Sequence, residues 1–183
     1  MRILSGLYKG RSLVAPKGEE TRPTLAKVRG ALFDSLQGDL GGGRFLDLFA
    51  GSGAMGFEAM SRGVDYVCWV EESHQAVRCI LRNVEQLHID RSRGDIQKKE
   101  VFTWLEKVAP KLPPFDWIFA DPPYGAGYSR LLVEKIDERH FLKAGGTFFV
   151  ETTDLLEGVP LQNMQLKRVR DFGKTAIYEY RLL

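Results

Sequence analysis

The stretch that decides the fold is FLDLFAGSGAMG, residues 45–56. Its first part, Phe45–Phe49, is an apolar run typical of a buried strand, and it leads directly into Gly51-Ser52-Gly53-Ala54-Met55-Gly56. These six residues fit the pattern G-x-G-x-x-G, in which glycines make a tight turn between a strand and a helix and let the backbone approach a ligand closely. The stretch therefore predicts a strand, a ligand-binding loop and a helix in succession.

The regions around this stretch show the same alternation of strand and helix. Apolar strands are expected at 44–49, 65–70, 96–99, 115–120 and 147–150, and helices at 54–62, 73–87, 101–108 and 128–138. Such alternation implies right-handed βαβ units and a doubly wound, mostly parallel sheet, so the expected fold class is α/β and Rossmann-like. Gln165–Phe172 and Thr175–Leu182 predict an antiparallel hairpin on one edge, which brings the sheet to seven strands.

The first forty residues are predicted to form a small hairpin-plus-helix appendage. Residues 1–15 interleave apolar and polar side chains as a hairpin does, and a helix is expected from Pro23-Thr24 to about Leu36, with Thr24 as its N-cap. Gly41-Gly42-Gly43 then breaks the pattern. We therefore expect an N-terminal extension over residues 1–40 and a main domain over 41–183, packed as one compact unit.

Length and composition favour a globular protein of one domain. The 183 residues are 44% hydrophobic and 27% charged, no apolar run is long enough to span a bilayer, and the N-terminus lacks the apolar region of a signal peptide. Cys68 and Cys79 are too few for a disulfide framework or a metal-ligand cluster, so buried free thiols are expected. These features predict a cytoplasmic protein that holds no metal, with a monomer as the default state.

The charge is unevenly distributed along the chain, although its net value is only +2. Residues 1–30 contain seven Lys or Arg and two acids, whereas the remaining 153 residues contain 19 basic and 22 acidic side chains. A basic segment ahead of a mildly acidic body is a modest indication of nucleic-acid binding. A solvated basic face is the equal alternative at this point.

Two acids near the glycine loop indicate which ligand it binds. Glu71 lies 20 residues after Gly51, at the end of the next strand, where a carboxylate can bind the two hydroxyls of a ribose. Asp47 lies in the strand before the loop, and a negative charge there suits a ligand with an ammonium group, such as S-adenosylmethionine, better than a pyrophosphate. The alternatives are that Asp47 is a structural acid bonded to loop amides and that the glycines only ease packing.

A nucleotide-binding oxidoreductase is the rival from another class of protein, because a pyrophosphate can also bind at the start of a helix. Such an enzyme needs an acid–base residue for hydride transfer. The three histidines, His74, His88 and His140, all fall in or beside helical stretches and are expected at the surface.

The tetrapeptide Asp121-Pro122-Pro123-Tyr124 follows an apolar run at the point where a buried strand leaves the sheet. Pro123 has a fixed φ and no N–H, and it biases Pro122 toward extended conformations, so the turn is rigid and its carbonyls remain available. A carboxylate, a carbonyl and an aromatic face together suit an exocyclic amino group on a flat heteroaromatic ring. The alternative is an ordinary loop that contains prolines.

Taken in order, three motifs resemble those of a class I S-adenosylmethionine-dependent methyltransferase acting on an amino nitrogen: residues 47–56, then Val70-Glu71, then Asp121–Tyr124. The basic start is more specific. Gly10-Arg11, Arg22-Pro23-Thr24 and Val28-Arg29 resemble the bacterial 16S rRNA guanine-N2 methyltransferase family that modifies the small ribosomal subunit. The resemblance covers nearly the whole chain.

This resemblance implies roles for three groups of residues. The cofactor-binding residues would be Asp47, Phe49, Gly51, Ser52, Gly53, Glu71 and Glu100, of which Glu71 would bind the ribose and Glu100 the adenine. The target base would lie against Asp121, Pro122, Pro123 and Tyr124, and the phosphates of the RNA against Arg11, Arg22, Lys27 and Arg29. Asp95 is a rival of Glu100, and Gly30 stands where the family often has an acid.

The expected reaction is in-line displacement, in which an amino nitrogen attacks the sulfonium methyl and S-adenosylhomocysteine leaves. Specificity would come from a folded RNA, since 183 residues hold no large recognition domain. Adenine-N6 methylation of RNA or DNA is the nearest alternative. A protein glutamine methyltransferase and an inactive RNA-binding factor with the same fold also remain open.

Overall fold

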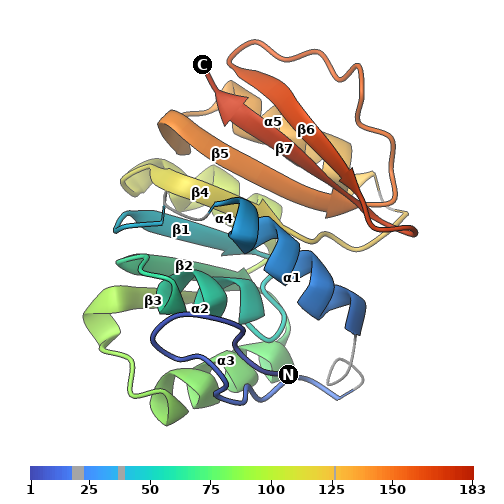
Figure 1. The fold of residues 1–183 in the computed structure, drawn as a ribbon. Helices are drawn as coiled ribbons and strands as arrows, with labels where there is room; N and C mark the ends of the chain where they lie inside the picture. The colour runs from blue at the N-terminus through green and yellow to red at the C-terminus, as the bar shows by residue number, and fades with distance from the viewer. Residues whose placement is uncertain (18–22, 37–39, 126) are drawn as a thin grey trace. The chain divides into compact units, whose positions relative to one another are not determined.

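The computed structural model describes residues 1–17, 23–36, 40–125 and 127–183. Their packing divides the chain into two compact units, Met1–Val101 and Phe102–Leu183. Figure 1 shows the helices and strands of both units. The elements of both units follow the predicted alternation of strand and helix closely. None of the helices in the described ranges is long and apolar enough to cross a membrane.

The first unit contains three parallel strands with their connecting helices. Its strands lie in the order β3-β2-β1, and Leu46 of β1 is in register with Cys68 of β2, which in turn is in register with Asp95 of β3. In chain order the elements are α1 (Pro23–Ser35), β1 (Arg44–Leu48), α2 (Ala54–Ser61), β2 (Tyr66–Glu71), α3 (His74–Gln86), the 3-10 turn η1 (Arg91–Arg93) and β3 (Gly94–Lys98).

The second unit contains a mixed group of four strands in the order β4-β5-β7-β6. The pair β4 and β5 is parallel, whereas β7 is antiparallel to both β5 and β6. In chain order the elements are α4 (Val101–Lys107, which begins at the last residue of the first unit), η2 (Ala109–Lys111), β4 (Phe115–Ala120), α5 (Tyr128–Glu138), β5 (Leu142–Thr152), β6 (Met164–Asp171) and β7 (Ala176–Leu182).

The predicted fold class is confirmed, because the chain is α/β and its sheet has seven strands. The strands β1–β5 are mostly parallel, and β6 and β7 form an antiparallel hairpin. The clearest difference is β5, which begins at Leu142 rather than at Thr147. Phe115 pairs with Leu142 but Trp117 pairs with Thr147, so residues 143–146 bulge out of the ladder. Gly145 and Gly146 lie in this bulge, and because they interrupt the apolar pattern the sequence did not indicate that the strand begins at Leu142.

The predicted N-terminal hairpin is a closed turn with only one bridge, between Arg2 and Ser12, rather than two strands. It packs inside the first unit, close to the end of α2. There the Leu7 amide donates to the Ser61 carbonyl at 2.7 Å and the Tyr8 amide donates to the Ser61 hydroxyl at 2.9 Å. Gly6 has a φ of +80°, and a side chain there would collide with the Ser61 carbonyl. That residues 1–40 act as a separate extension stays a prediction.

Candidate active site

The glycine loop turns sharply out of β1 and places its backbone at the carboxyl end of the strand. Phe49, Gly51 and Gly53 all have positive φ, at 57°, 54° and 76°. Such a value is ordinary for glycine, but for a phenylalanine it stores strain of order 1–3 kcal/mol, which is typical of residues held in place at functional sites. The loop is therefore a fixed surface of backbone at one end of the sheet.

Glu71 holds this loop and the start of α3 together. Its carboxylate accepts hydrogen bonds from the Gly51 amide at 2.8 Å and the Ser73 amide at 2.7 Å, one on each oxygen, and the residue is only 9% exposed. Each carboxylate oxygen has a further lone pair that can accept a bond from a hydroxyl. The geometry is thus compatible with the ribose role, and it adds a structural role that the sequence did not reveal.

Asp47 is 1% exposed, and its carboxylate accepts a hydrogen bond from the Gly56 amide in the first turn of α2 at 2.9 Å. This is the structural role that the sequence left open as an alternative. That Asp47 also favours a cationic ligand group stays a prediction.

Tight packing explains why the pattern needs glycine at its last position. A Cβ atom on Gly56 would lie 2.2 Å from Nε1 of Trp69 and 2.6 Å from Cγ1 of Val67, which is impossible without movement. The Trp69 ring is held beside the loop because its Nε1 donates to the Gly53 carbonyl at 3.2 Å and the ring packs on Phe57. The glycines therefore bring α2 against β2 as well as shaping the loop.

Replacing Gly56 with Ala is expected to lower the free energy of unfolding by about 1–3 kcal/mol, because the buried indole of Trp69 must move. Urea unfolding followed by tryptophan fluorescence measures this change. Gly41→Ala is the control, because nothing lies within 4 Å of a Cβ built there and its φ is not in the positive range. Equal stability of the two variants would contradict this account of the packing.

Glu100 and Asp95, the two rivals for the adenine, occupy different parts of the third strand region. Asp95 is the second residue of β3 and is in register with Cys68 in mid-strand, where it accepts a hydrogen bond from the Gln97 side chain. Glu100 follows the end of β3 and directly precedes α4, on the side where Lys98 is in register with Glu71. Glu100 therefore lies at the same carboxyl edge as Glu71, and Asp95 does not.

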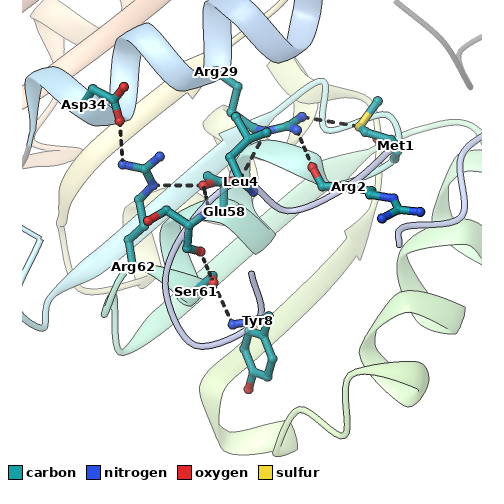
Figure 2. Close-up of polar contacts among 12 residues, drawn as sticks. Met1, Arg2, Leu4, Tyr8, Arg29, Asp34, Glu58, Ser61 and Arg62 are labelled. Carbon is teal, nitrogen blue, oxygen red and sulfur yellow. Dashed lines mark hydrogen bonds and ion pairs between the residues drawn. The ribbon is translucent and has the colours of Figure 1, made fainter. Parts of the chain in front are cut away.

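The predicted phosphate-binding residues fall into different environments. Arg11 and Lys27 are exposed, and Arg22 lies outside the described residues. Arg29 differs from the expectation, because it is 2% exposed and donates to the Arg2 carbonyl at 2.7 Å and to the Met1 sulfur at 3.4 Å (Figure 2). Its Nε also lies 3.4 Å from the Glu58 carboxylate. Arg29 is a structural residue of the first unit, and we do not retain it as an RNA contact.

Glu58 is the centre of this polar network, and sequence reasoning missed it. The carboxylate is fully buried and accepts hydrogen bonds from the Leu4 and Ser5 amides at 2.8 and 3.0 Å and from Arg62 at 2.9 Å (Figure 2). Burial lowers the pKa of Arg29, and the charge of Glu58 counteracts that effect. The network attaches the N-terminal turn to the helix that follows the glycine loop.

Asn83 is a second residue that the sequence did not indicate. It is fully buried in α3, and its side-chain amide accepts from the Val14 amide at 2.7 Å and donates to the Val14 carbonyl at 2.9 Å. The same nitrogen lies 3.3 Å from the Ser52 carbonyl in the glycine loop. An asparagine in a helix carries no visible signal of such a bridge in the sequence.

In the second unit, residues 121–124 stand at the carboxyl end of β4, as predicted. Pro122 is buried, Asp121 is half-buried and Tyr124 is 52% exposed. The turn continues into α5 through Gly127, which has a positive φ and precedes the first helical residue. These four residues lie in the second unit, whereas the glycine loop, Glu71 and Glu100 lie in the first.

Glu151 is an acid at the same edge of the second unit that the sequence analysis did not single out. Ala120 pairs with Val150, so Asp121 and Glu151 follow at the ends of neighbouring parallel strands. Burial raises the pKa of Glu151, and a hydrogen bond from the Thr175 hydroxyl at 2.9 Å opposes that rise. Its position directly after the apolar run 147–150 was the available signal.

The histidines and the cysteines occupy the environments that the sequence predicts. His74, His88 and His140 are exposed, and Cys68 and Cys79 are buried free thiols, as predicted. Burial raises the pKa of Cys68, which keeps it protonated. Among the described residues there is no group of three or more His, Cys, Asp or Glu side chains that could hold a metal ion.

Known proteins resemble this chain over its whole length. YlbH of Bacillus subtilis is 34% identical over 183 residues, covering 99% of this chain and 98% of its own. Ribosomal RNA small subunit methyltransferase D of Haemophilus influenzae is 30% identical over 182 residues, covering 100% and 92%. The solved structure of yhhF from Escherichia coli has a TM-score of 0.86 at 27% identity, covering 100% of this chain and 97% of that one.

The fold, the glycine loop with its acid and the turn after β4 define a class I S-adenosylmethionine-dependent methyltransferase. Residues 1–181 match the family model described as Conserved hypothetical protein 95, and the chain belongs to that family. The family covers the basic N-terminal segment as well as the strand–loop–helix core.

Proposed function

We propose that this protein transfers a methyl group from S-adenosylmethionine to the exocyclic N2 of a guanine in 16S ribosomal RNA, within an assembled or partly assembled small subunit. The observation that carries the proposal is the position of residues 121–124, which place a half-buried carboxylate, two prolines and a half-exposed tyrosine directly after the end of β4. A relative of 30% identity is named for methylation of small-subunit ribosomal RNA, which supports the substrate class.

In this proposal the first unit holds the cofactor. The backbone of Gly51, Ser52 and Gly53 and the charge of Asp47 would receive the methionine part, and Phe49 would fix the path of the loop. Glu71 would bind the ribose hydroxyls and Glu100 the adenine, because both acids stand at the carboxyl edge of the parallel strands. The cofactor supplies an activated methyl group on a sulfonium centre, which is already a good leaving group.

The second unit would hold the base. The N2 lone pair of guanine is delocalised into the ring, so the nitrogen becomes a better nucleophile when its two N–H groups are held out of conjugation. Asp121 and the Pro122 carbonyl would accept these two hydrogen bonds and stabilise the positive charge that develops on the nitrogen. Pro123 keeps the turn rigid, and Asp121 or water would take the proton after transfer.

Tyr124 would stack on the base, a contact with a typical contribution of about 1–3 kcal/mol. A paired base cannot reach such a turn, so the target must be single-stranded or flipped out of its helix. Arg11 and Lys27 would contact phosphates, and Arg22 stays a proposed contact outside the described residues. We propose that the enzyme acts as a monomer in the cytoplasm, where it meets ribosomal subunits.

The experiment that tests this function is transfer of labelled methyl from S-adenosylmethionine to small ribosomal subunits from cells that lack the protein. Digestion to nucleosides and mass spectrometry then identify the product. We expect label in N2-methylguanosine. Label in N6-methyladenosine would retain the chemistry but replace the substrate, and absence of label from both subunits and naked 16S RNA, despite cofactor binding, would overturn the proposal.

A further inference from the structure

We propose that a basic groove along α3, outside the predicted site, binds the phosphate backbone of the RNA substrate; this inference rests on the function proposed above. The groove has a volume of about 530 Å³ and lies between the N-terminal segment and residues 74–82 of α3. Its walls are Val14, Ala15 and Lys17 on one side and His74, Gln75, Arg78, Cys79 and Arg82 on the other.

Among the described residues that line this groove, the charged side chains are all basic. Lys17, Arg78 and Arg82 are all exposed, and the described residues that line the groove include no Asp or Glu. None of the ion pairs found within the described ranges involves these three side chains. Arg78 and Arg82 are one helical turn apart, about 6 Å along the axis, and like charges at that spacing destabilise a helix slightly. A bound anion would relieve this repulsion.

The groove is built into the fold, because its N-terminal wall is hydrogen-bonded to α3. Asn83 binds both backbone groups of Val14, and the Gln86 side chain donates to the Ser12 carbonyl at 3.0 Å. Arg11 donates to the Gln86 carbonyl at 3.1 Å, so this arginine is held at the far end of the same helix. Lys17, Arg78, Arg82 and Arg11 thus follow the seam between the N-terminal segment and α3.

The position of the groove connects it to the reaction. It begins at His74, three residues after Glu71, and therefore opens at the edge where the glycine loop lies. It shares no residue with the cofactor-binding set named above. Several point charges in a row along an open groove suit a polyanion, because each cation that neutralises a phosphate releases bound counterions. RNA is the polyanion that this function requires.

The test compares R78Q/R82Q with wild type for binding to 16S ribosomal RNA, naked and within small subunits, over a series of salt concentrations. Each lost phosphate contact lowers the slope of log K against log salt by about 0.7–0.9, so removal of two lowers it by about 1.4–1.8. We expect at least a tenfold loss of affinity at low salt. Affinity for S-adenosylhomocysteine should stay unchanged, and the unfolding midpoint should not fall, because the substitution also removes the repulsion between the two arginines.

The matched control is K107Q/K111Q, which removes the same charge from exposed positions at the end of α4 and in η2, before β4 begins. Unchanged affinity and slope in R78Q/R82Q would overturn the groove while leaving the methyltransferase function standing. Loss of binding to subunits but not to naked RNA would assign the groove to an acidic protein surface and also overturn the inference. A wild-type protein without salt-dependent RNA binding or methyl transfer would overturn both proposals.

Discussion

Replacing Asp121 with Ala is expected to lower the rate of methyl transfer by about 100- to 1,000-fold. The variant loses one of the two acceptors proposed for the target amine, and a preorganised group that stabilises developing charge is typically worth that factor. Cofactor affinity should change little, because the cofactor residues belong to the first unit and Asp121 to the second. The expected signature is therefore a fall in kcat with S-adenosylhomocysteine binding retained.

Single-turnover methyl transfer to small subunits, with calorimetric titration of S-adenosylhomocysteine, measures the two quantities separately. Asp116→Asn is the matched control on the same strand. Asp116 lies near the start of β4, away from the turn, and pairs with Lys143 at 2.8 Å on a partly exposed surface, where an ion pair contributes at most about 1 kcal/mol. Full methyl transfer by Asp121→Ala would contradict the acceptor role proposed for Asp121, whereas absence of transfer by both wild type and variant would favour the inactive RNA-binding factor.

Replacing Glu58 with Gln is expected to lower the free energy of unfolding by about 3–5 kcal/mol. The substitution keeps the shape of the side chain but removes the charge that compensates buried Arg29, and breaking a buried ion pair by removing one partner has this magnitude. The Leu4 and Ser5 amides each donate to one oxygen of the carboxylate. In glutamine one of these oxygens becomes an NH2 group, which cannot accept a hydrogen bond, so one of the two bonds is lost. The N-terminal turn should loosen together with α2.

Urea unfolding of the two variants Glu58→Gln and Glu134→Gln isolates the effect of burial. Both glutamates form an ion pair with an arginine four residues away, but the Arg130–Glu134 pair is exposed and the Arg62–Glu58 pair is buried. Loss of the exposed pair should change stability by no more than about 0.5 kcal/mol. Similar losses in both variants would show that the network around Arg29 contributes little.

Most of the fold could be predicted from local patterns in the sequence. The apolar runs, the glycine loop and the proline turn are each determined by a few neighbouring residues. For this reason β1, α2, β4 and α5 begin where the sequence predicts. The start of β5 was missed because a glycine bulge interrupts its alternation. Asp47 and Glu71 could be placed beside the loop from the sequence because their distance from it is fixed by the βαβ unit.

The parts that escaped prediction depend on partners far apart in the sequence. The sequence around Arg29 predicts an exposed cation. In the folded protein Arg29 is buried beside Glu58, which lies 29 residues later in the chain. Asn83 meets Val14 across 69 residues and Ser52 across 31. No periodicity records such pairings, because they arise from tertiary packing.

The contact between the N-terminal turn and Ser61 has a consequence for how the first unit opens. A helix end leaves carbonyls without partners, and here Leu7, more than fifty residues upstream, supplies the donor for one of them. The turn is therefore the C-cap of α2 in a hydrogen-bonding sense, and the two segments belong to one cooperative unit of local unfolding. We therefore expect the N-terminal turn, with its basic side chains Arg2, Lys9 and Arg11, to become ordered together with the helix that begins at the glycine loop.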